Sequence, residues 1–171
     1  ASKGKIMKIT DFMNFEQIKF SIYSTARAIP NMMDGFKTST RKIIWAALRR
    51  NVKKQIKVAQ LGAYVSEHSD YHHGEASLMG AIVGMAVDYT GTNNISLLLP
   101  KGRYGSLLAG PAAAASPRYI FTMLSPLTRM IFRKEDDCLL TYMQSDDGDD
   151  VEPQFYLPVI PFSLVNGIQG I

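Results

Sequence analysis

The sequence predicts an α+β fold that is mainly helical, and two observations indicate this class. Apolar residues recur at helical spacing in several long segments, whereas only short stretches favour strands. Two of the expected helices are joined by a short polar turn, and a glycine-rich basic turn between two strands follows them. A helix-turn-helix followed by a β wing predicts a winged-helix domain. The chain has 171 residues, 46% of them hydrophobic, and is therefore long enough to bury a core.

The first two expected helices stand on either side of a turn. Residues 9–28 place apolar side chains at near-helical intervals, and Pro30 ends the pattern. Residues 33–36 predict a turn in which Gly35 supplies a positive φ. Residues 38–50 predict a second helix with basic residues beside its apolar stripe. The stripe consists of Ile43, Ile44, Ala47 and Leu48.

The expected helix-turn-helix occupies residues 58–67 and 75–89. Leu61 and Val65 mark the apolar face of its first helix, and the polar residues 69–74 form the turn. In DNA-binding proteins the second helix of such a pair enters a groove of the DNA. Helix pairs with short polar turns also occur in folds that never bind DNA, so this pattern alone leaves the function open.

The expected wing follows the helix pair. A strand over residues 95–99, a basic turn over 100–105 and a strand at 107–108 form its hairpin. The small residues at 110–115 predict a loop, and 118–122 favour a short strand.

The last part of the chain changes in character. Ser125 as N-cap, with Pro126 at the first helical position, predicts a helix through Phe132. Residues 144–152 are acidic and predict a linker, and residues 155–161 predict a strand that begins a second subdomain. The expected division is a connecting segment and helix at 1–26, the winged-helix domain at 27–145, and the linker with the first strands of the second subdomain at 146–171.

Charge is distributed unevenly along the chain. All 19 Lys and Arg residues lie between Lys3 and Lys134 with only 7 acidic residues among them, a net charge of +12. Residues 135–171 hold the other 8 acids and no base, a net charge of −8. Residues 37–57 alone carry eight basic side chains and no acid. This asymmetry predicts that the first part binds a polyanion, although runs of charge also occur on ordinary solvated faces.

Composition argues against several classes of protein. The sequence has no run of about 18 apolar residues and its first residues lack a signal peptide's apolar stretch, so we expect no membrane span and an intracellular location. Cys138 is the single cysteine and there are three histidines, so neither an internal disulfide nor a zinc site is expected. Three acidic residues precede Cys138 and disfavour a thiolate, and we interpret it as a packing residue.

Residues 115–122, Ala-Ser-Pro-Arg-Tyr-Ile-Phe-Thr, resemble the active-site tyrosine segment of the type IIA DNA topoisomerases. Several other rare motifs resemble this family and occur in the same order, and together they are far more specific than any single motif. They resemble its eukaryotic and large-DNA-virus branch more than bacterial gyrase. The resemblance implies that the second subdomain is the start of the family's mixed α/β tower domain. The further motifs are residues 58–61, 71–75, 93–94 and 165–167.

Tyr119 has the chemistry that reversible DNA cleavage requires. The nucleophile must store the free energy of the phosphodiester in a covalent bond and return it. A phenol of pKa about 10 leaves a phosphotyrosine ester far more readily than an aliphatic alcohol would. Arg118 beside it can stabilise charge that develops on the phosphate, but neighbouring residues on a strand point to opposite faces. Either Arg118 reaches around, or the backbone is irregular there.

The resemblance also implies roles for residues elsewhere. His73, just before the expected recognition helix, is predicted to donate a hydrogen bond to a phosphate oxygen, with a capping role as the alternative. Asp34 is expected to hold part of a cationic cluster, and Lys53 to contact phosphate. Ile171 resembles the isoleucine that wedges between base pairs, a buried strand position being the alternative. The residues expected to position the scissile phosphate are Arg27, Lys37 and Arg41.

Three departures from the family pattern indicate a divergent member. Residues 37–41 lack the proline and glycine usual between that lysine and arginine, which leaves the local loop geometry open. Residues 110–113 lack a lysine-aspartate pair common in cellular eukaryotic members, and the acidic linker is slightly longer. A cellular origin implies location in the nucleus, and a viral origin implies the host cytoplasm.

For a full enzyme the resemblance implies an ATP-driven homodimer that passes one DNA duplex through a transient double-strand break in another. This chain shows no ATPase phosphate-binding motif, and its acid run at 146–150 is interpreted as solvated linker. ATP and Mg²⁺ are therefore expected to bind outside it. A noncatalytic winged-helix module, such as a transcription factor, explains the charge equally well but not residues 116–119. A tyrosine recombinase would need differently spaced arginines and histidines.

Overall fold

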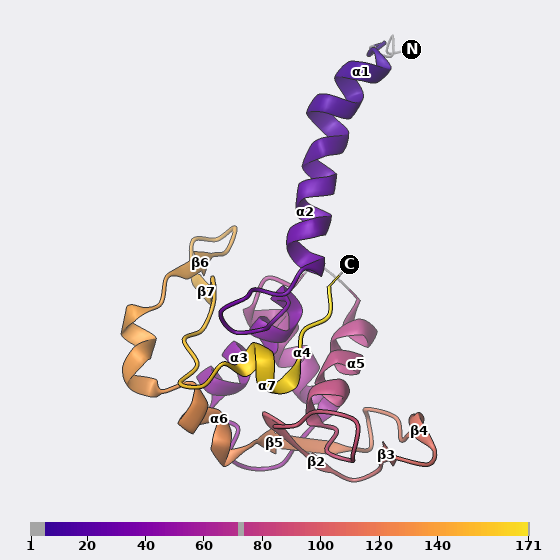
Figure 1. Cartoon of the computed structure of the whole chain (residues 1–171), viewed down its shortest axis with the longest axis vertical. Helices are drawn as coiled ribbons and strands as arrows, with labels where there is room; N and C mark the ends of the chain where they lie inside the picture. Colours follow the sequence, from indigo (N-terminus) through magenta and orange to yellow (C-terminus); the bar gives the residue numbers. More distant parts are fainter. Residues whose placement is uncertain (1–5, 72–73, 171) are drawn as a thin grey trace.

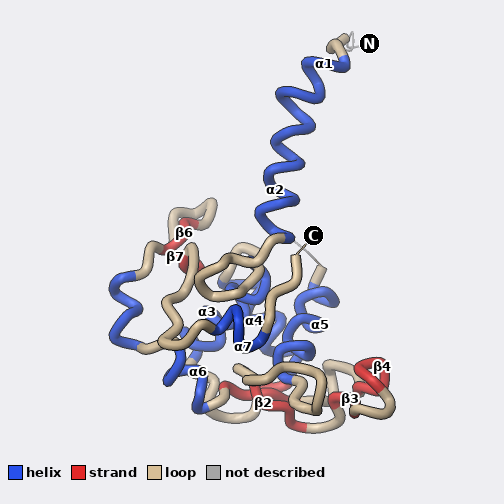
Figure 2. The backbone as a smooth tube through the Cα atoms, viewed as in Figure 1, coloured by secondary structure: helices blue, strands red, loops and turns tan. Residues whose placement is uncertain are grey.

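The computed structural model describes residues 6–71 and 74–170, and in them it is a mixed fold of helices and strands, as predicted (Figure 1). Figure 2 shows the strands in separate places around the helices, with β6 and β7 apart from β2, β3 and β4. The helices are α1 (Ile9–Asp11), the π-helix η1 (Phe12–Gln17), α2 (Ile18–Ala28), α3 (Thr38–Arg50), α4 (Val58–His68), α5 (Glu75–Ala86), α6 (Pro126–Ile131), the 3-10 helix η2 (Lys134–Leu139) and α7 (Phe162–Asn166). The strands are β1 (Ile56–Lys57), β2 (Leu98–Lys101), β3 (Tyr104–Ser106), β4 (Gly110–Ala114), β5 (Phe121–Leu124), β6 (Tyr142–Gln144) and β7 (Asp150–Pro153).

The N-terminal elements α1, η1 and α2 follow one another as one long helix that projects from the rest of the molecule (Figure 1). Among the described residues, none in these three elements is buried, and Phe15 is 62% exposed. The predicted helix is therefore confirmed, but its apolar side chains do not contribute to the core of this chain. It ends where predicted, because Ile29 is extended ahead of Pro30.

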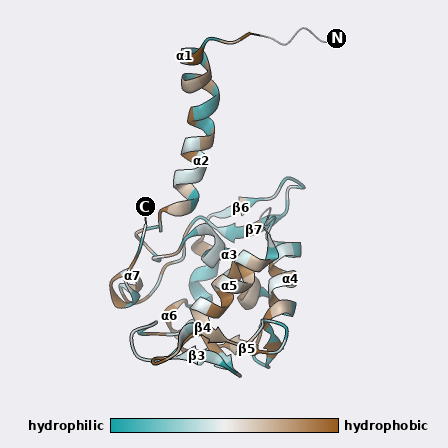
Figure 3. Cartoon of the chain, turned by 90° about the vertical axis from the view of Figure 1, so that its right-hand side faces the viewer, coloured by the Kyte–Doolittle hydropathy of each residue, from teal (hydrophilic) through white to brown (hydrophobic). Residues whose placement is uncertain are grey.

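The core lies between α3, α4 and α5. The predicted stripe of α3 is confirmed, since Ile43 and Ile44 are fully buried against apolar side chains of the next two helices. Figure 3 shows hydrophobic residues concentrated in these packed helices and hydrophilic ones in the β6–β7 hairpin. Asn51 adopts the left-handed conformation that ends α3, with φ 53°.

A small antiparallel sheet of order β1-β5-β2 covers one side of the helices. Ile56 faces Thr122, and Leu98 faces Leu124. The first turn of α4 follows β1 directly, so the sheet fixes where that helix begins. The predicted strand at 95–99 begins three residues later, because Ile95 exchanges hydrogen bonds with the side chain of Asn166 instead of with a strand.

The predicted wing hairpin is wrong in its pairing. β2 pairs with β5, and the hairpin is formed by β3 and β4, with its turn at residues 107–109. The expected loop at 110–115 is strand β4 for most of its length. Glycine allows this pairing, because a Cβ at Gly105 would lie 2.5 Å from the carbonyl oxygen of Gly110. Residues 110–114 therefore form a strand because their backbone approaches that of β3 closely, although their small side chains favour a loop.

The acidic tail differs from the expected linker and strand. β6 and β7 form a hairpin, and Val151 and Glu152 in β7 are buried, whereas residues 155–161 contain no strand. Tyr156 instead packs its ring against Phe132 in the core. Side-chain packing against the core holds the tail, and the apolar pattern of residues 155–161 does not predict this packing.

Cys138 was interpreted above as a packing residue, and this is wrong. The residue is exposed on η2, and its thiol contacts the carbonyl oxygen of Glu135. The 3-10 helix η2 leaves this side chain in solvent, so its apolar character is not used in the core.

The helix predicted after Ser125 is confirmed as α6, with the Ser125 hydroxyl accepting from the N–H of Leu127 at 3.3 Å. Among the described residues, the helices are too short or too polar to cross a membrane.

Candidate functional site

Tyr119 lies on an exposed turn between β4 and β5. Its N–H donates to the carbonyl of Ser116 at 2.8 Å, and the residue is 76% exposed. We call residues 116–120 the tyrosine turn. Arg118, also exposed, lies in the same turn, and the predicted strand at 118–122 begins only at Phe121. The backbone is therefore irregular at this point, so strand geometry does not force Arg118 to the face opposite Tyr119.

The tyrosine turn is fixed to the start of α4. The N–H of Val58 donates to the carbonyl of Ile120 at 3.0 Å, and the N–H of Ala59 donates to that of Pro117 at 3.1 Å. The first amides of a helix have no partner inside the helix, and here the turn supplies acceptors for two of them. The phenol of Tyr119 is thus exposed on a backbone that is held at both ends.

Tyr104 supports the same region from the hairpin. Its hydroxyl donates to the carbonyl of Phe121 at 2.7 Å, just after the tyrosine turn. Burial raises the pKa of Tyr104 to about 12, and a hydrogen bond with Thr122 lowers it by a smaller amount. Tyr104 therefore stays neutral and keeps this hydrogen bond at any physiological pH.

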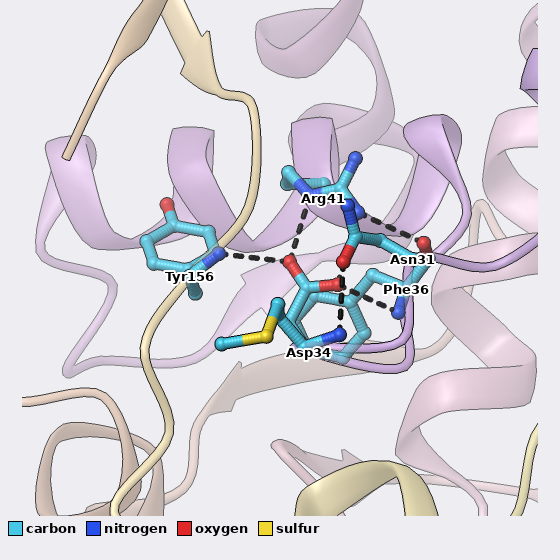
Figure 4. Close-up of polar contacts among 6 residues, drawn as sticks. Asn31, Asp34, Phe36, Arg41 and Tyr156 are labelled. Carbon is cyan, nitrogen blue, oxygen red and sulfur yellow. Dashed lines mark hydrogen bonds and ion pairs between the residues drawn. The ribbon is translucent and has the colours of Figure 1, made fainter.

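A buried cluster surrounds the carboxylate of Asp34 (Figure 4). Arg41 Nε donates to Asp34 Oδ2 at 2.8 Å, and Arg41 Nη2 donates to Oδ1 at 2.9 Å. The backbone N–H groups of Phe36 and Tyr156 complete the set, each donating to Asp34 at 2.9 Å. We call these four residues the Asp34 cluster. Asp34 is fully buried and Arg41 is 6% exposed, so this charged pair joins the loop before α3 to the tail.

The structure describes the loop before α3, whose geometry the sequence leaves open. Gly35 has φ 73°, as predicted for the turn, and a Cβ there would lie 3.0 Å from Ser163 Cα. Lys37 is extended and α3 begins at Thr38, so the N–H of Arg41 donates to the carbonyl of Lys37 at 3.0 Å. Arg41 therefore projects from the first turn of a helix, and the Asp34 carboxylate fixes its direction.

A cavity of about 620 Å³ gathers cationic side chains from α2, α3 and the residue before α3. Arg27 and Lys37, both predicted to position the scissile phosphate, line it together with Lys42, and we call it the cationic cavity. The guanidinium of Arg27 also lies over the ring of Tyr23, 5.4 Å from its centroid. The other lining residues are Tyr23, Ala26, Ala28, Thr38, Ser39, Asp70, Tyr71, Ser77 and Glu152.

The structure brings some predicted residues together and separates others. Arg27 and Lys37 share the cationic cavity, whereas Arg41 is paired in the Asp34 cluster and Lys53 is exposed in the loop after α3. The cationic cavity lies at the end of α4, and the tyrosine turn is bonded to its start. With a rise of 1.5 Å per residue, the 11 residues of α4 place the two ends of this helix about 16 Å apart. His73 and Ile171 lie outside the described residues.

Among the described residues, no group of three or more His, Cys, Asp or Glu side chains lies close enough together to hold a metal ion. The acid run interpreted as linker forms the exposed turn of the β6–β7 hairpin, where Gly148 has φ 85°.

Two residues of the cationic cavity were not predicted from the sequence. Lys42 Nζ donates to Glu152 Oε2 at 2.9 Å, although 110 positions separate them, and both side chains are largely buried. In the sequence Lys42 is one of several bases on α3, and Glu152 is the last acid of an acidic run. The one available signal was the apolar neighbour Val151, which indicates a strand with one buried face.

Comparison with known proteins agrees with this geometry. Residues 27–171 match the family model that describes the A subunit of DNA gyrase/topoisomerase IV. The chain belongs to that family. Its predicted membership of the type IIA topoisomerases is therefore confirmed, and the tyrosine turn lies within the region that this gyrase/topoisomerase IV model matches.

Individual relatives are similar over nearly the whole chain. DNA topoisomerase 2 of Arabidopsis thaliana is 53% identical over 162 residues, which are 95% of this chain and 11% of that protein. DNA topoisomerase 2 of Bombyx mori is 50% identical over 98% of this chain, again 11% of the relative. The solved DNA-binding, cleavage and re-ligation domain of Plasmodium falciparum topoisomerase II covers 94% of this chain, and this chain covers 22% of it, at 49% identity and a TM-score of 0.88. The chain thus spans only a small part of its relatives.

Proposed function

We propose that this chain is the DNA-binding and cleavage part of a type II DNA topoisomerase, with Tyr119 as the nucleophile. The observation that carries the proposal is the exposure of the Tyr119 phenol on a turn fixed to α4, within a chain about half identical to DNA topoisomerase 2. A tyrosine kept for packing would be buried, as Tyr104 and Tyr156 are.

The proposed reaction is a reversible transesterification. The Tyr119 oxygen attacks a DNA phosphorus, the P–O bond to the 3′ oxygen breaks, and the 5′ phosphate remains on the tyrosine while the 3′ oxygen leaves with a proton. Negative charge grows on the phosphate in the transition state, and the neighbouring Arg118 guanidinium is the group that stabilises it. Attack by the 3′ hydroxyl reverses the step and restores the DNA.

The arrangement of α3, α4 and α5 on the β1-β5-β2 sheet, with the β3–β4 hairpin beside it, supports a winged-helix domain. In that scheme α5 is the recognition helix and the hairpin is the wing, with the domain spanning residues 27–145. Residues 1–26 would form the connecting helix, and 146–171 the start of the tower domain.

The distance between the tyrosine turn and the cationic cavity supports a homodimer. The two ends of α4 are about 16 Å apart, farther than a tyrosine side chain reaches, which favours a site that takes the tyrosine and the cavity from two chains. We propose that Tyr119 of one subunit meets the cationic cavity of the other. ATP and Mg²⁺ would be bound by parts of the longer enzyme outside this chain.

Mixed dimers test this arrangement. Consider full-length enzyme with Tyr119→Phe in one subunit and Lys37→Ala in the other. Under the proposal, the changed tyrosine meets the changed cavity in one site, and the second site keeps an intact tyrosine and an intact cavity. We expect such dimers to cut one DNA strand and leave the other whole. The comparison dimer carries both substitutions in one subunit beside a wild-type subunit. If this dimer cuts one strand, and the dimer with one substitution in each subunit cuts none, the site lies within one chain.

The activity itself is tested by Tyr119→Phe in the full-length enzyme. The change should abolish cleavage and relaxation and leave DNA affinity nearly unchanged, since only the attacking oxygen is lost. Tyr89→Phe, outside the tyrosine turn, is the matched control and should keep both activities. Retained cleavage by Tyr119→Phe would contradict the proposed function.

A further inference from the structure

Lys42 has an unusual position for a lysine in a proposed DNA-binding surface. Its side chain is 12% exposed, and its ammonium joins three distant segments of the chain. Nζ donates to the Glu152 carboxylate on β7 at 2.9 Å and to the carbonyl of Ser69 at the end of α4. A surface lysine that contacts phosphate needs a mobile head group, and this one is held by buried partners.

The carbonyl that Lys42 holds belongs to the residue that ends α4. Ser69 is fully buried, and both its N–H and its hydroxyl donate to the carbonyl of Val65. Asp70 follows with φ 51°, a left-handed conformation that few residues other than glycine adopt. From there the chain enters the turn that carries the predicted His73 and then α5. The hydrogen bond from Lys42 therefore ties the end of α4 to α3.

Glu152 determines where Lys42 points. Its side chain is 6% exposed, so its carboxylate has lost most of its contact with water, and the Lys42 ammonium is its ion-pair partner. Lys42 and Glu152 both line the cationic cavity beside Arg27 and Lys37. Glu152 thus neutralises Lys42, and the cavity is also lined by the cations Arg27 and Lys37 and by the acid Asp70.

We propose that Lys42 and Glu152 are a pair of positioning residues for DNA cleavage. The pair holds residues 69–71, just after α4, against α3 and β7, and thereby holds the wall of the cationic cavity that Asp70 and Tyr71 form, without contacting the phosphate. This inference rests on the proposed function, and it predicts a separation of effects. Loss of the pair lowers the cleavage rate on bound DNA, whereas loss of a phosphate contact lowers affinity.

Single-turnover cleavage of a nicked suicide substrate tests the pair in the full-length enzyme with Mg²⁺ present. At saturating enzyme, Lys42→Met should lower the cleavage rate by roughly 10- to 100-fold, the size found when a residue that orients a metal ligand is removed. Its Kd for DNA should stay within about threefold, and its salt slope should not change. Lys42→Arg keeps the charge and the donors and should recover most of the rate.

Glu152→Gln provides a second, milder variant, because the amide oxygen still accepts from Lys42 while the charge is lost. It should slow cleavage less than Lys42→Met does, and the double variant should be no slower than Lys42→Met alone. Lys54→Met and Glu67→Gln remove exposed side chains of the same types and should leave the single-turnover rate at saturation unchanged.

Hydrogen exchange separates this proposal from the proposed function. In Lys42→Met the amides of residues 70–76 should exchange faster than in wild type, while those of buried α3 residues keep their protection, whether or not the protein cleaves DNA. If Lys42→Met binds DNA more weakly, loses about one unit of salt slope and cleaves normally once saturated, Lys42 is a phosphate contact and the proposal is wrong. Unchanged exchange at 70–76 overturns it as well.

Discussion

The Asp34 cluster and the tyrosine turn both resemble the same family in sequence, yet the first is buried and the second is exposed. Asp34 is fully buried and accepts four hydrogen bonds, whereas Tyr119 is 76% exposed on a turn held through its backbone. A charged residue predicted to act on DNA can therefore be part of the scaffold. The phenol of Tyr119, the proposed nucleophile, is exposed and therefore accessible to DNA.

The largest effect that distinguishes the two regions is on stability. Asp34→Ala leaves the Arg41 guanidinium buried without its partner and should lower the free energy of unfolding by about 3–5 kcal/mol. Tyr119→Phe should change it by less than about 0.5 kcal/mol, because an exposed hydroxyl is lost. Urea denaturation of both variants makes the comparison. Similar losses for the two would mean that the tyrosine turn is also structural.

Catalysis should show the reverse pattern. Arg118→Ala and His73→Ala in the full-length enzyme should slow single-turnover cleavage by roughly 100- to 1000-fold, about 3–4 kcal/mol, because each loses a donor to charge that develops in the transition state. Stability and DNA affinity should change little. A variant that binds weakly but cleaves normally at saturation would show that its residue only positions the DNA.

Tyr104 offers a pH-dependent test of how the tyrosine turn is supported. Its folded pKa is about 12, above the usual 10, so its contribution to stability is complete below pH 10 and is lost as the pH rises toward 12. Wild type should lose roughly 2–3 kcal/mol over this interval that Tyr104→Phe does not lose. Parallel alkaline unfolding curves for the two proteins would contradict the assignment.

The smallest expected effect concerns Lys53, which is exposed after α3 and belongs to neither region. Lys53→Ala should reduce the salt slope of DNA binding by about one, and should leave cleavage at saturation nearly unchanged. Binding should also weaken steeply with salt and show little sequence preference. A strong preference at physiological salt would favour the noncatalytic DNA-binding module instead.

The helices could be predicted from the sequence, and two other features could not. Apolar spacing marks α4 because its buried residues lie on one face, whereas α3 is buried all around at residues 43–47. The β3–β4 hairpin was misassigned because small residues at 110–114 have the composition of a loop, and only the partner strand makes them a strand. The Lys42–Glu152 pair joins residues 110 positions apart, so no local pattern records it. The sequence also gives the charge of Arg41 but not its burial against Asp34, and its role at the scissile phosphate stays a prediction.

Covalent attachment of Tyr119 to DNA is tested most directly by trapping the adduct. Full-length enzyme is denatured during Mg²⁺-dependent cleavage of a labelled oligonucleotide and digested with trypsin, and the DNA-linked peptide is sequenced by mass spectrometry. We expect one adduct, a peptide spanning residues 119–129 with the 5′ phosphate of the DNA on the Tyr119 oxygen. An adduct on another tyrosine, on a serine, or at a 3′ end of the DNA would contradict the assignment of Tyr119 as the nucleophile.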